Sequence, residues 1–278
     1  GKPELSELAG TVDSIGRPIQ ITGDAFKAGF FANALETTFV KAKASIRKRM
    51  KANANEWPDQ KQTRYRSREV SMFGKVQNAL EKWFAKDAGS KAGAVLLDQA
   101  IKETDGLARL FGVGKIRGLR SLTGGRVRAN MGDAVMGVNA KGWLKRNGDD
   151  MLASRKASTS KWKRGDYVWN RPNSIADYYD DPLDRVRSTV YHEFGHLVHS
   201  NYKTLVGSGS YYNPIVEKWF MGKRLRGTGA SVYADKNAHE WFAENFSLWA
   251  RRKDDLVAPR FKKLIEAMLN GADELSGI

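Results

Sequence analysis

The feature that most constrains this chain is the motif His-Glu-Phe-Gly-His at residues 192–196, in which two histidines stand four positions apart. This spacing has chemical meaning only on a helix, where residues four apart project from the same face one turn apart. The surrounding sequence predicts a helix over residues 182–200, because Asp180 or Asp181 can cap it and Pro182 suits its first position. Apolar residues recur at helical intervals and predict a core-facing side, namely Leu183, Val186, Val190, Phe194 and Leu197.

On such a helix the imidazoles of His192 and His196 can reach one small cation. Glu193 sits one step further round the helix, where its carboxylate can contact a water on that cation and act as a general base. A five-residue pattern also arises by accident on a polar helix face, so the motif alone leaves that alternative open. A third ligand has to decide between the two interpretations.

The next histidine along the chain, His199, does not suit the third position. It follows His192 by seven residues, about 10 Å along a helix axis, whereas each ligand lies about 2 Å from a zinc ion. We therefore expect His199 beside the site or on the surface. Because the chain has no cysteine, every ligand must be a histidine, an aspartate or a glutamate.

A second helix is predicted near the C-terminal end of the chain. Asn237 can cap it, and a broad apolar face follows, formed by Ala238, Trp241, Phe242, Phe246 and Trp249. On this helix Glu240 has an ordinary explanation as the acidic member of a capping box, and Glu244 has another as a solvated residue one turn later. His239 faces about 100° away from Glu240, so we expect it on the surface or beside the site.

The motif at 192–196, together with Tyr233 and with Glu240 in Glu-Trp-Phe-Ala-Glu-Asn-Phe, resembles the catalytic domain of anthrax-lethal-factor-type zinc metallopeptidases. This gluzincin-like family includes the bacterial Pro-Pro endopeptidases, and similar domains occur in phage-associated proteins. The resemblance covers residues 183–249 and does not extend to residues 1–91. It implies that His192, His196 and Glu240 bind zinc.

The same resemblance implies roles for three further side chains. Glu193 would be the general base, and the hydroxyl of Tyr233 would stabilise the oxyanion. Glu244 would match the second acidic residue of the family, which orients a histidine ligand.

The expected fold class is α+β. A helix over residues 94–111 precedes short apolar, glycine-rich segments at 116–122 and 126–139, and a further strand is predicted at 166–169. We therefore expect a zincin-like domain over residues 92–278, with a small sheet packed on the motif helix and the second ligand-bearing helix downstream.

Residues 1–91 are expected to form a separate, mainly helical region. Apolar periodicity predicts helices at 24–50 and 69–86, and a short helix is also predicted at 214–220 in the C-terminal part. The sequence Ala-Gly-Ser at residues 88–90 is typical of a junction between domains.

The net charge is +16, and its distribution is uneven. Residues 115–164 carry 13 Lys and Arg against 3 Asp and Glu, whereas residues 165–278 carry 15 of each. Segments 41–51 and 115–164 are thus candidates for nonspecific contact with nucleic acid or another polyanion; the alternative is a solvated basic surface. No apolar run approaches the roughly 18 residues of a membrane span, and the N-terminus lacks a signal-peptide core, so we expect a soluble chain.

Three functions compete at this point. The first is a zinc endopeptidase that cleaves a protein or peptide, as a delivered effector or toxin or as a processing enzyme. The second is a protease carried in a phage virion. The third is a nucleic-acid-binding structural protein with a vestigial zinc site, against which the presence of Glu193 and Tyr233 argues.

Overall fold

The computed structural model describes residues 12–20, 26, 35–55, 82–116, 118–122, 129–132, 135–154, 171–201, 214–222 and 225–270. The described helices are α3 (Leu35–Asn55), α5 (Ala88–Leu110), α6 (Lys145–Leu152), α7 (Pro182–Asn201), α8 (Pro214–Met221), α9 (Ala238–Ala250) and α10 (Pro259–Leu269). A π-helical turn, Ala140–Leu144, leads into α6, and single 3-10 turns occur at Ile175–Asp177 and Tyr233–Asp235.

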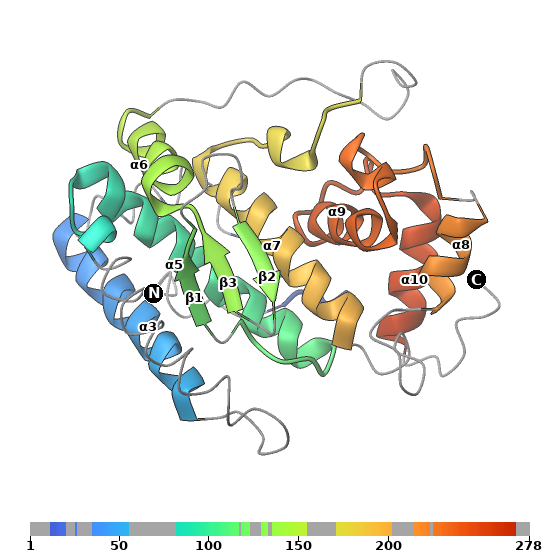
Figure 1. Cartoon of the computed structure of the whole chain (residues 1–278), viewed down its shortest axis with the longest axis horizontal. Helices are drawn as coiled ribbons and strands as arrows, with labels where there is room; N and C mark the ends of the chain where they lie inside the picture. The colour runs from blue at the N-terminus through green and yellow to red at the C-terminus, as the bar shows by residue number, and fades with distance from the viewer. Residues whose placement is uncertain are drawn as a thin grey trace.

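Helix α5 occupies the centre of the molecule and packs on α3, α6 and α7 (Figure 1). Most of its side chains are buried, so the helix is covered on nearly every side. Its N-terminus is capped by Asp87, whose side chain accepts a hydrogen bond from the backbone N–H of Ser90 over 2.8 Å.

The strands are β1 (Gly118–Ser121), β2 (Ala129–Gly132) and β3 (Val135–Val138), four residues each. They form a sheet in the order β1-β3-β2, in which β3 pairs parallel to β1 and antiparallel to β2. β2 lies beside α7, and β1 lies beside α3 (Figure 1).

The expected α+β class is wrong, because 66% of the described residues are helical and the described strands are only four residues long. Helix α7 is buried chiefly between α5 and α9 rather than against a sheet. The predicted glycine-rich segments do contain the three described strands, but helices supply most of the contacts of α7. Strand formation depends on side-chain packing as much as on local alternation, so the pattern overestimated the sheet.

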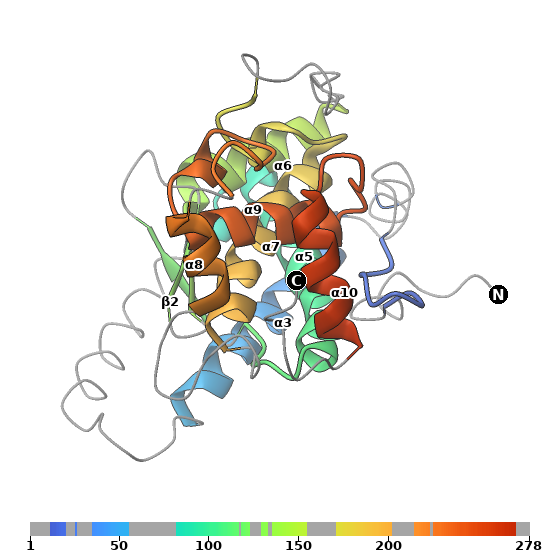
Figure 2. The ribbon, with the colours of Figure 1, turned by 90° about the vertical axis from the view of Figure 1, so that its right-hand side faces the viewer.

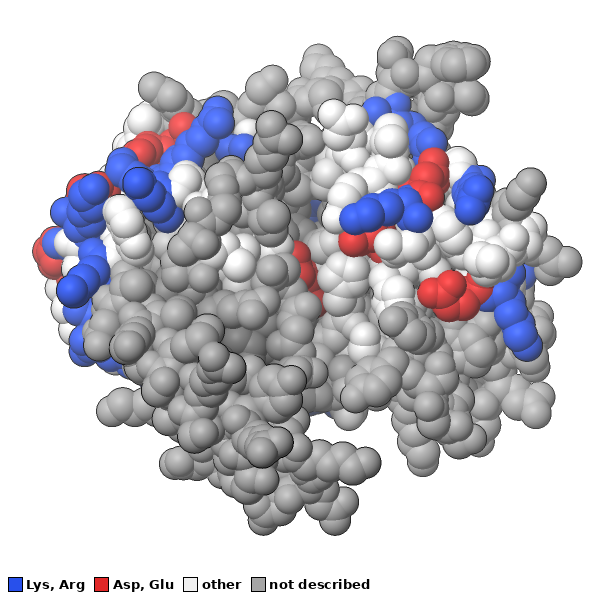
Figure 3. All heavy atoms as spheres, in the orientation of Figure 1, with Lys and Arg blue, Asp and Glu red and all other residues white. Residues whose placement is uncertain are grey.

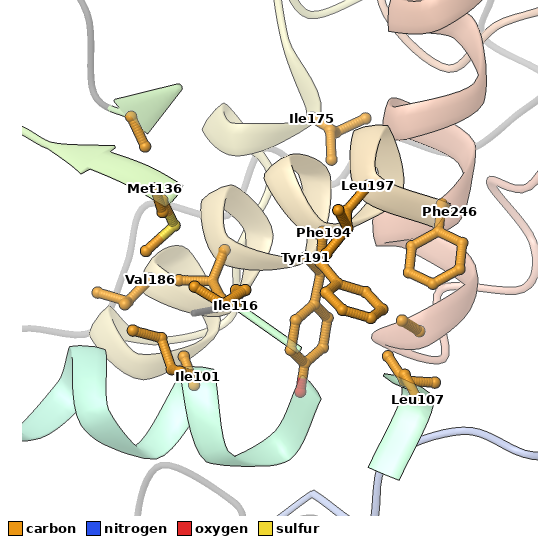
Figure 4. Packing of buried hydrophobic residues seen from close by; sticks show 14 of the residues in the cluster. Ile101, Leu107, Ile116, Met136, Ile175, Val186, Tyr191, Phe194, Leu197 and Phe246 are labelled. Atoms are coloured by element: carbon orange, nitrogen blue, oxygen red, sulfur yellow. The ribbon is translucent and has the colours of Figure 1, made fainter. Parts of the chain in front are cut away.

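The core is continuous across α5, α7 and α9. Figure 4 shows Ile101 and Leu107 of α5 facing Val186, Tyr191 and Phe194 of α7. Phe246 of α9 meets Phe194, with ring centroids 6.0 Å apart. Helices α8 and α10 pack on opposite sides of α9 (Figure 2), and thus this second helix is held in place from three directions.

A buried ion pair joins α5 to α7. The guanidinium of Arg187 donates to Glu103 from Nε over 2.8 Å and from Nη2 over 2.6 Å. The hydroxyl of Tyr191 donates to the same carboxylate over 2.6 Å, and the amide of Gln99 donates over 3.0 Å. With four donors on one carboxylate, this network fixes the helix that carries the histidine motif on the central helix.

Several sequence predictions are confirmed. The motif helix spans Pro182–Asn201, and the short helix expected at 214–220 is α8. The division of the chain at residue 91 stays a prediction, although residues 88–91 form the first turn of α5 and α3 packs on that helix. Most of the helix expected at 69–86 and the strand expected at 166–169 lie outside the described residues.

Candidate metal centre

The two motif histidines are carried by α7, whose start is fixed by its cap. The carboxylate of Asp181 accepts a hydrogen bond from the backbone N–H of Asp184 over 2.8 Å, as an N-cap does. The carboxylate of Asp184 in turn lies 3.1 Å from Arg251 and accepts from the backbone N–H of Asp180. From this anchored start, His192 and His196 fall on the side of α7 that faces α9.

Gly195 lets the two helices approach closely at the site. A Cβ atom added there would lie 3.0 Å from the Cα of Ala243 and 3.1 Å from the Cβ of Phe246. Such contacts are tighter than ordinary van der Waals packing, so a larger side chain would push α9 away from α7. The glycine inside the motif therefore determines how near Glu240 comes to the histidines.

Three atoms from these helices converge on one point. Glu240 Oε2 lies 3.1 Å from His192 Nε2 and 3.4 Å from His196 Nε2, and the two histidine atoms are 3.2 Å apart. Ligands about 2.0–2.1 Å from a tetrahedral ion are about 3.3 Å from one another. His192, His196 and Glu240 could thus hold a metal ion, and they form the one such cluster found among the described residues.

Electrostatics at this point favour a positive charge. Burial disfavours imidazolium at His192, but hydrogen bonds with Glu240 and Glu244 outweigh it and raise the pKa of His192 to about 10. Burial likewise opposes ionisation of Glu240, yet its hydrogen bonds with His192 and His196 hold the pKa of the carboxyl below its usual range. Either a proton or a metal cation can supply that charge.

Glu244 is buried behind His192 rather than solvated. Its side chain is 1% exposed, and Oε1 lies 3.2 Å from His192 Nδ1. Oε2 accepts hydrogen bonds from the hydroxyl of Ser231 over 2.5 Å and from the backbone N–H of Ile175 over 2.9 Å. A carboxylate held this way fixes the ring orientation of His192 and leaves its Nε2 atom directed at the cluster.

Tyr233 and Glu193 lie at the same site. The hydroxyl of Tyr233 donates to Glu240 Oε1 over 3.1 Å, and burial raises the pKa of this phenol to about 12 with a further contribution from the charge of Glu240. Glu193 is 6% exposed, and burial raises the pKa of its carboxyl although His192 and His196 oppose that shift. A buried carboxylate with a raised pKa is suited to accept a proton.

His199 is not part of the cluster, as expected, but it is not on the surface either. It is fully buried, stacks on Phe242 with ring centroids 4.7 Å apart, and places Nδ1 3.0 Å from Nδ1 of His239. Burial holds the pKa of His199 well below its usual value, and proximity to His239 adds to this. His199 thus acts as a neutral core residue.

The structure brings together every residue selected from the sequence: His192, Glu193, His196, Tyr233, Glu240 and Glu244. Asn237 caps α9 by accepting from the N–H of Glu240 over 2.9 Å, while the Glu240 carboxylate faces the histidines. Sequence reasoning missed Ser174 and Ser231, which bind Glu244. No motif marks these serines, and only proximity to Tyr233 could have suggested Ser231.

Comparison of the chain with protein-family models, curated proteins and solved structures gave no match.

Proposed function

We propose that this chain is a zinc-dependent endopeptidase that hydrolyses protein or peptide substrates. The observation that carries the proposal is the triangle of His192 Nε2, His196 Nε2 and Glu240 Oε2, with sides of 3.1 to 3.4 Å. Two neutral imidazoles and one carboxylate are one of the ligand sets of catalytic zinc sites, which keep a fourth position open.

Zinc bound there would supply a Lewis acid that lowers the pKa of water toward about 7 and polarises a carbonyl group. Glu193 accepts the proton that leaves the attacking water and passes it to the nitrogen of the departing amine. The hydroxyl of Tyr233 donates a hydrogen bond to the oxygen on which negative charge develops. Glu244 holds the ring of His192 throughout, because its carboxylate contacts Nδ1.

The proposal is tested with the purified full chain and the Glu193→Gln variant, compared by metal analysis and by proteomic identification of cleavage sites. Wild type should bind zinc and cut peptides in a chelator-sensitive way, whereas Glu193→Gln should retain zinc and lose turnover. Glu217→Gln is the matched control, since Glu217 lies on α8 outside the cluster. Equal cleavage by wild type and Glu193→Gln would refute the assigned base.

Tyr233→Phe tests the second role separately. We expect it to lower kcat by about 10²- to 10³-fold, the cost of one oxyanion donor, with zinc content unchanged. Loss of the metal in this variant would instead assign Tyr233 a structural role through Glu240.

A second activity, contact with a polyanion, is favoured by one specific observation. Lys and Arg side chains gather on the part of the surface formed by α3 and α6 (Figure 3), and Lys41, Arg47 and Lys48 are exposed along α3. Binding to a DNA duplex that weakens steeply with salt would support this contact.

No described helix combines the length and apolar character needed to cross a lipid bilayer.

A further inference from the structure

We infer that residues 171–175 form a strap that holds Tyr233 in place beside the candidate metal ligands His192, His196 and Glu240, with Arg171 as the positioning residue. This inference deepens the proposed function and rests on it for its catalytic consequence. Its structural part stands on contacts between segments that are about 60 to 70 residues apart in the chain.

Arg171 fixes the turn that carries Tyr233. Its Nη2 atom donates to the carboxylate of Asp235 over 2.5 Å, and Nη1 donates to the carbonyl oxygens of Gly229 and Ser231 over 3.3 and 3.4 Å. The other oxygen of Asp235 accepts from the N–H of Gly227 over 2.9 Å. One partly buried guanidinium thus joins the loop before the turn to the end of the turn.

The backbone of the strap holds the turn at its centre. The N–H of Tyr233 donates to the carbonyl of Asn173 over 2.9 Å, and the N–H of Val232 donates to the carbonyl of Pro172 over 3.0 Å. Both bonds hold the backbone on the N-terminal side of the Cα of Tyr233, and the residue is 37% exposed, so the core does not enclose its ring. Its position over Glu240 therefore depends on how firmly its backbone is held.

The C-terminal end of the strap binds Glu244, the carboxylate that contacts His192. The hydroxyl of Ser174 and the N–H of Ile175 donate to the two oxygens of Glu244 over 3.2 and 2.9 Å. Glu244 contacts His192 Nδ1. A single five-residue segment thus sets the Tyr233 backbone and the His192 ring relative to each other, and Arg171 is the member that secures the Tyr233 side.

The structural test is hydrogen exchange in the full chain, which needs no substrate. In Arg171→Met the amides of Val232 and Tyr233 should exchange roughly tenfold faster or more, because the turn opens more often, while amides of α5 keep their rates. Arg17→Met is the matched control, since the Arg17 side chain has a similar exposure. Its ion pair with Asp254, 2.6 Å long, does not involve the strap. Wild-type exchange at both amides would overturn the inference.

Should Arg171→Met fail to fold, Asp235→Asn removes the same ion pair from the other side and is judged by the same two amides. Arg171→Lys should restore slow exchange only in part, because a lysine cannot reach the carboxylate and both carbonyls with one planar fork.

The catalytic test measures kcat and KM separately for the Arg171 and Tyr233 variants. Arg171→Met should lower kcat with KM and bound zinc unchanged, and it should cause no further loss in the Tyr233→Phe background, because it acts through the phenol. Additive losses would show that Arg171 acts elsewhere and would overturn its assigned role. A wild-type chain that cleaves nothing would refute the proposed function, while hydrogen exchange would still decide on the strap.

Discussion

Removal of the carboxylate of Glu103 tests the buried ion pair under the motif helix. Glu103 is 0% and Arg187 3% exposed at the side chain, so Glu103→Gln removes the carboxylate to which the buried guanidinium is hydrogen-bonded. Burial disfavours the charged form of Arg187, and the carboxylate of Glu103 outweighs that effect and raises its pKa. Breaking a buried pair from one side costs about 3–5 kcal/mol, a large fraction of the stability of a typical domain.

The paired variant Glu103→Leu with Arg187→Met gives the contrasting expectation. Since both charges leave together, the double variant should be more stable than either single variant. Glu36→Gln is the matched control: it makes the same change at an ion pair with Lys91 of α5, but the Glu36 side chain is 68% exposed, so the cost should stay below about 1 kcal/mol.

Urea unfolding at neutral pH measures wild type, Glu103→Gln, the control, the double variant and its two single variants, Glu103→Leu and Arg187→Met, provided that the m-value stays constant. A cost for Glu103→Gln near that of Glu36→Gln would refute the reasoning, as would a double variant whose loss equals the sum of the losses of Glu103→Leu and Arg187→Met. Either result would mean that water or a local rearrangement compensates the charge of Arg187.

Three further predictions concern the site and its surroundings. Glu244→Gln should weaken zinc binding about 10- to 100-fold in a competition titration, because a donor amide would then face His192 Nδ1; unchanged affinity would contradict the orienting role. Gly195→Val should cost about 1–3 kcal/mol in urea unfolding and weaken zinc binding, since the side chain separates α7 from α9; wild-type affinity would show that α9 can move without cost. The folded pKa of His199 lies below its unfolded value, so its stabilising effect is complete above about pH 6.5 and is lost as the pH falls, by up to about 1.4 kcal/mol per pH unit. Metal-free His199→Phe should therefore lose less stability than metal-free wild type between pH 7 and pH 5, and parallel stability curves would contradict this.

The candidate metal ligands and Tyr233 are held by different kinds of structural element. Helices α7 and α9 carry the three residues that could hold a metal ion, whereas Tyr233 lies in a single 3-10 turn that contacts the strap. Groups that act at a reacting centre gain from being held in one geometry, because a small displacement is costly for the rate. The variants of Arg171 and Tyr233 examine this division directly.

Local chemistry made much of the site predictable. Histidines four apart share a helix face whatever the rest of the fold does, and Asn237 caps α9 through its own backbone neighbours. The resemblance of the motif residues then selected Glu240 and Glu244 from a helix where both also had ordinary explanations. The environment of His199 was not predictable, because its burial comes from contact with Phe242 and His239 on another helix.

The sequence by itself determined the helices α7 and α9, the ligand-bearing face of α7 and the identity of the donor atoms, since these depend on periodicity, capping and side-chain type. Only the tertiary structure decided the mostly helical class, because strand length depends on packing partners rather than on local alternation. Tertiary structure alone also placed α9 against Gly195 and joined residues 171–175 to Tyr233 and Glu244. Those contacts link segments distant in sequence through hydrogen bonds and close packing, which leave no periodic pattern in the chain.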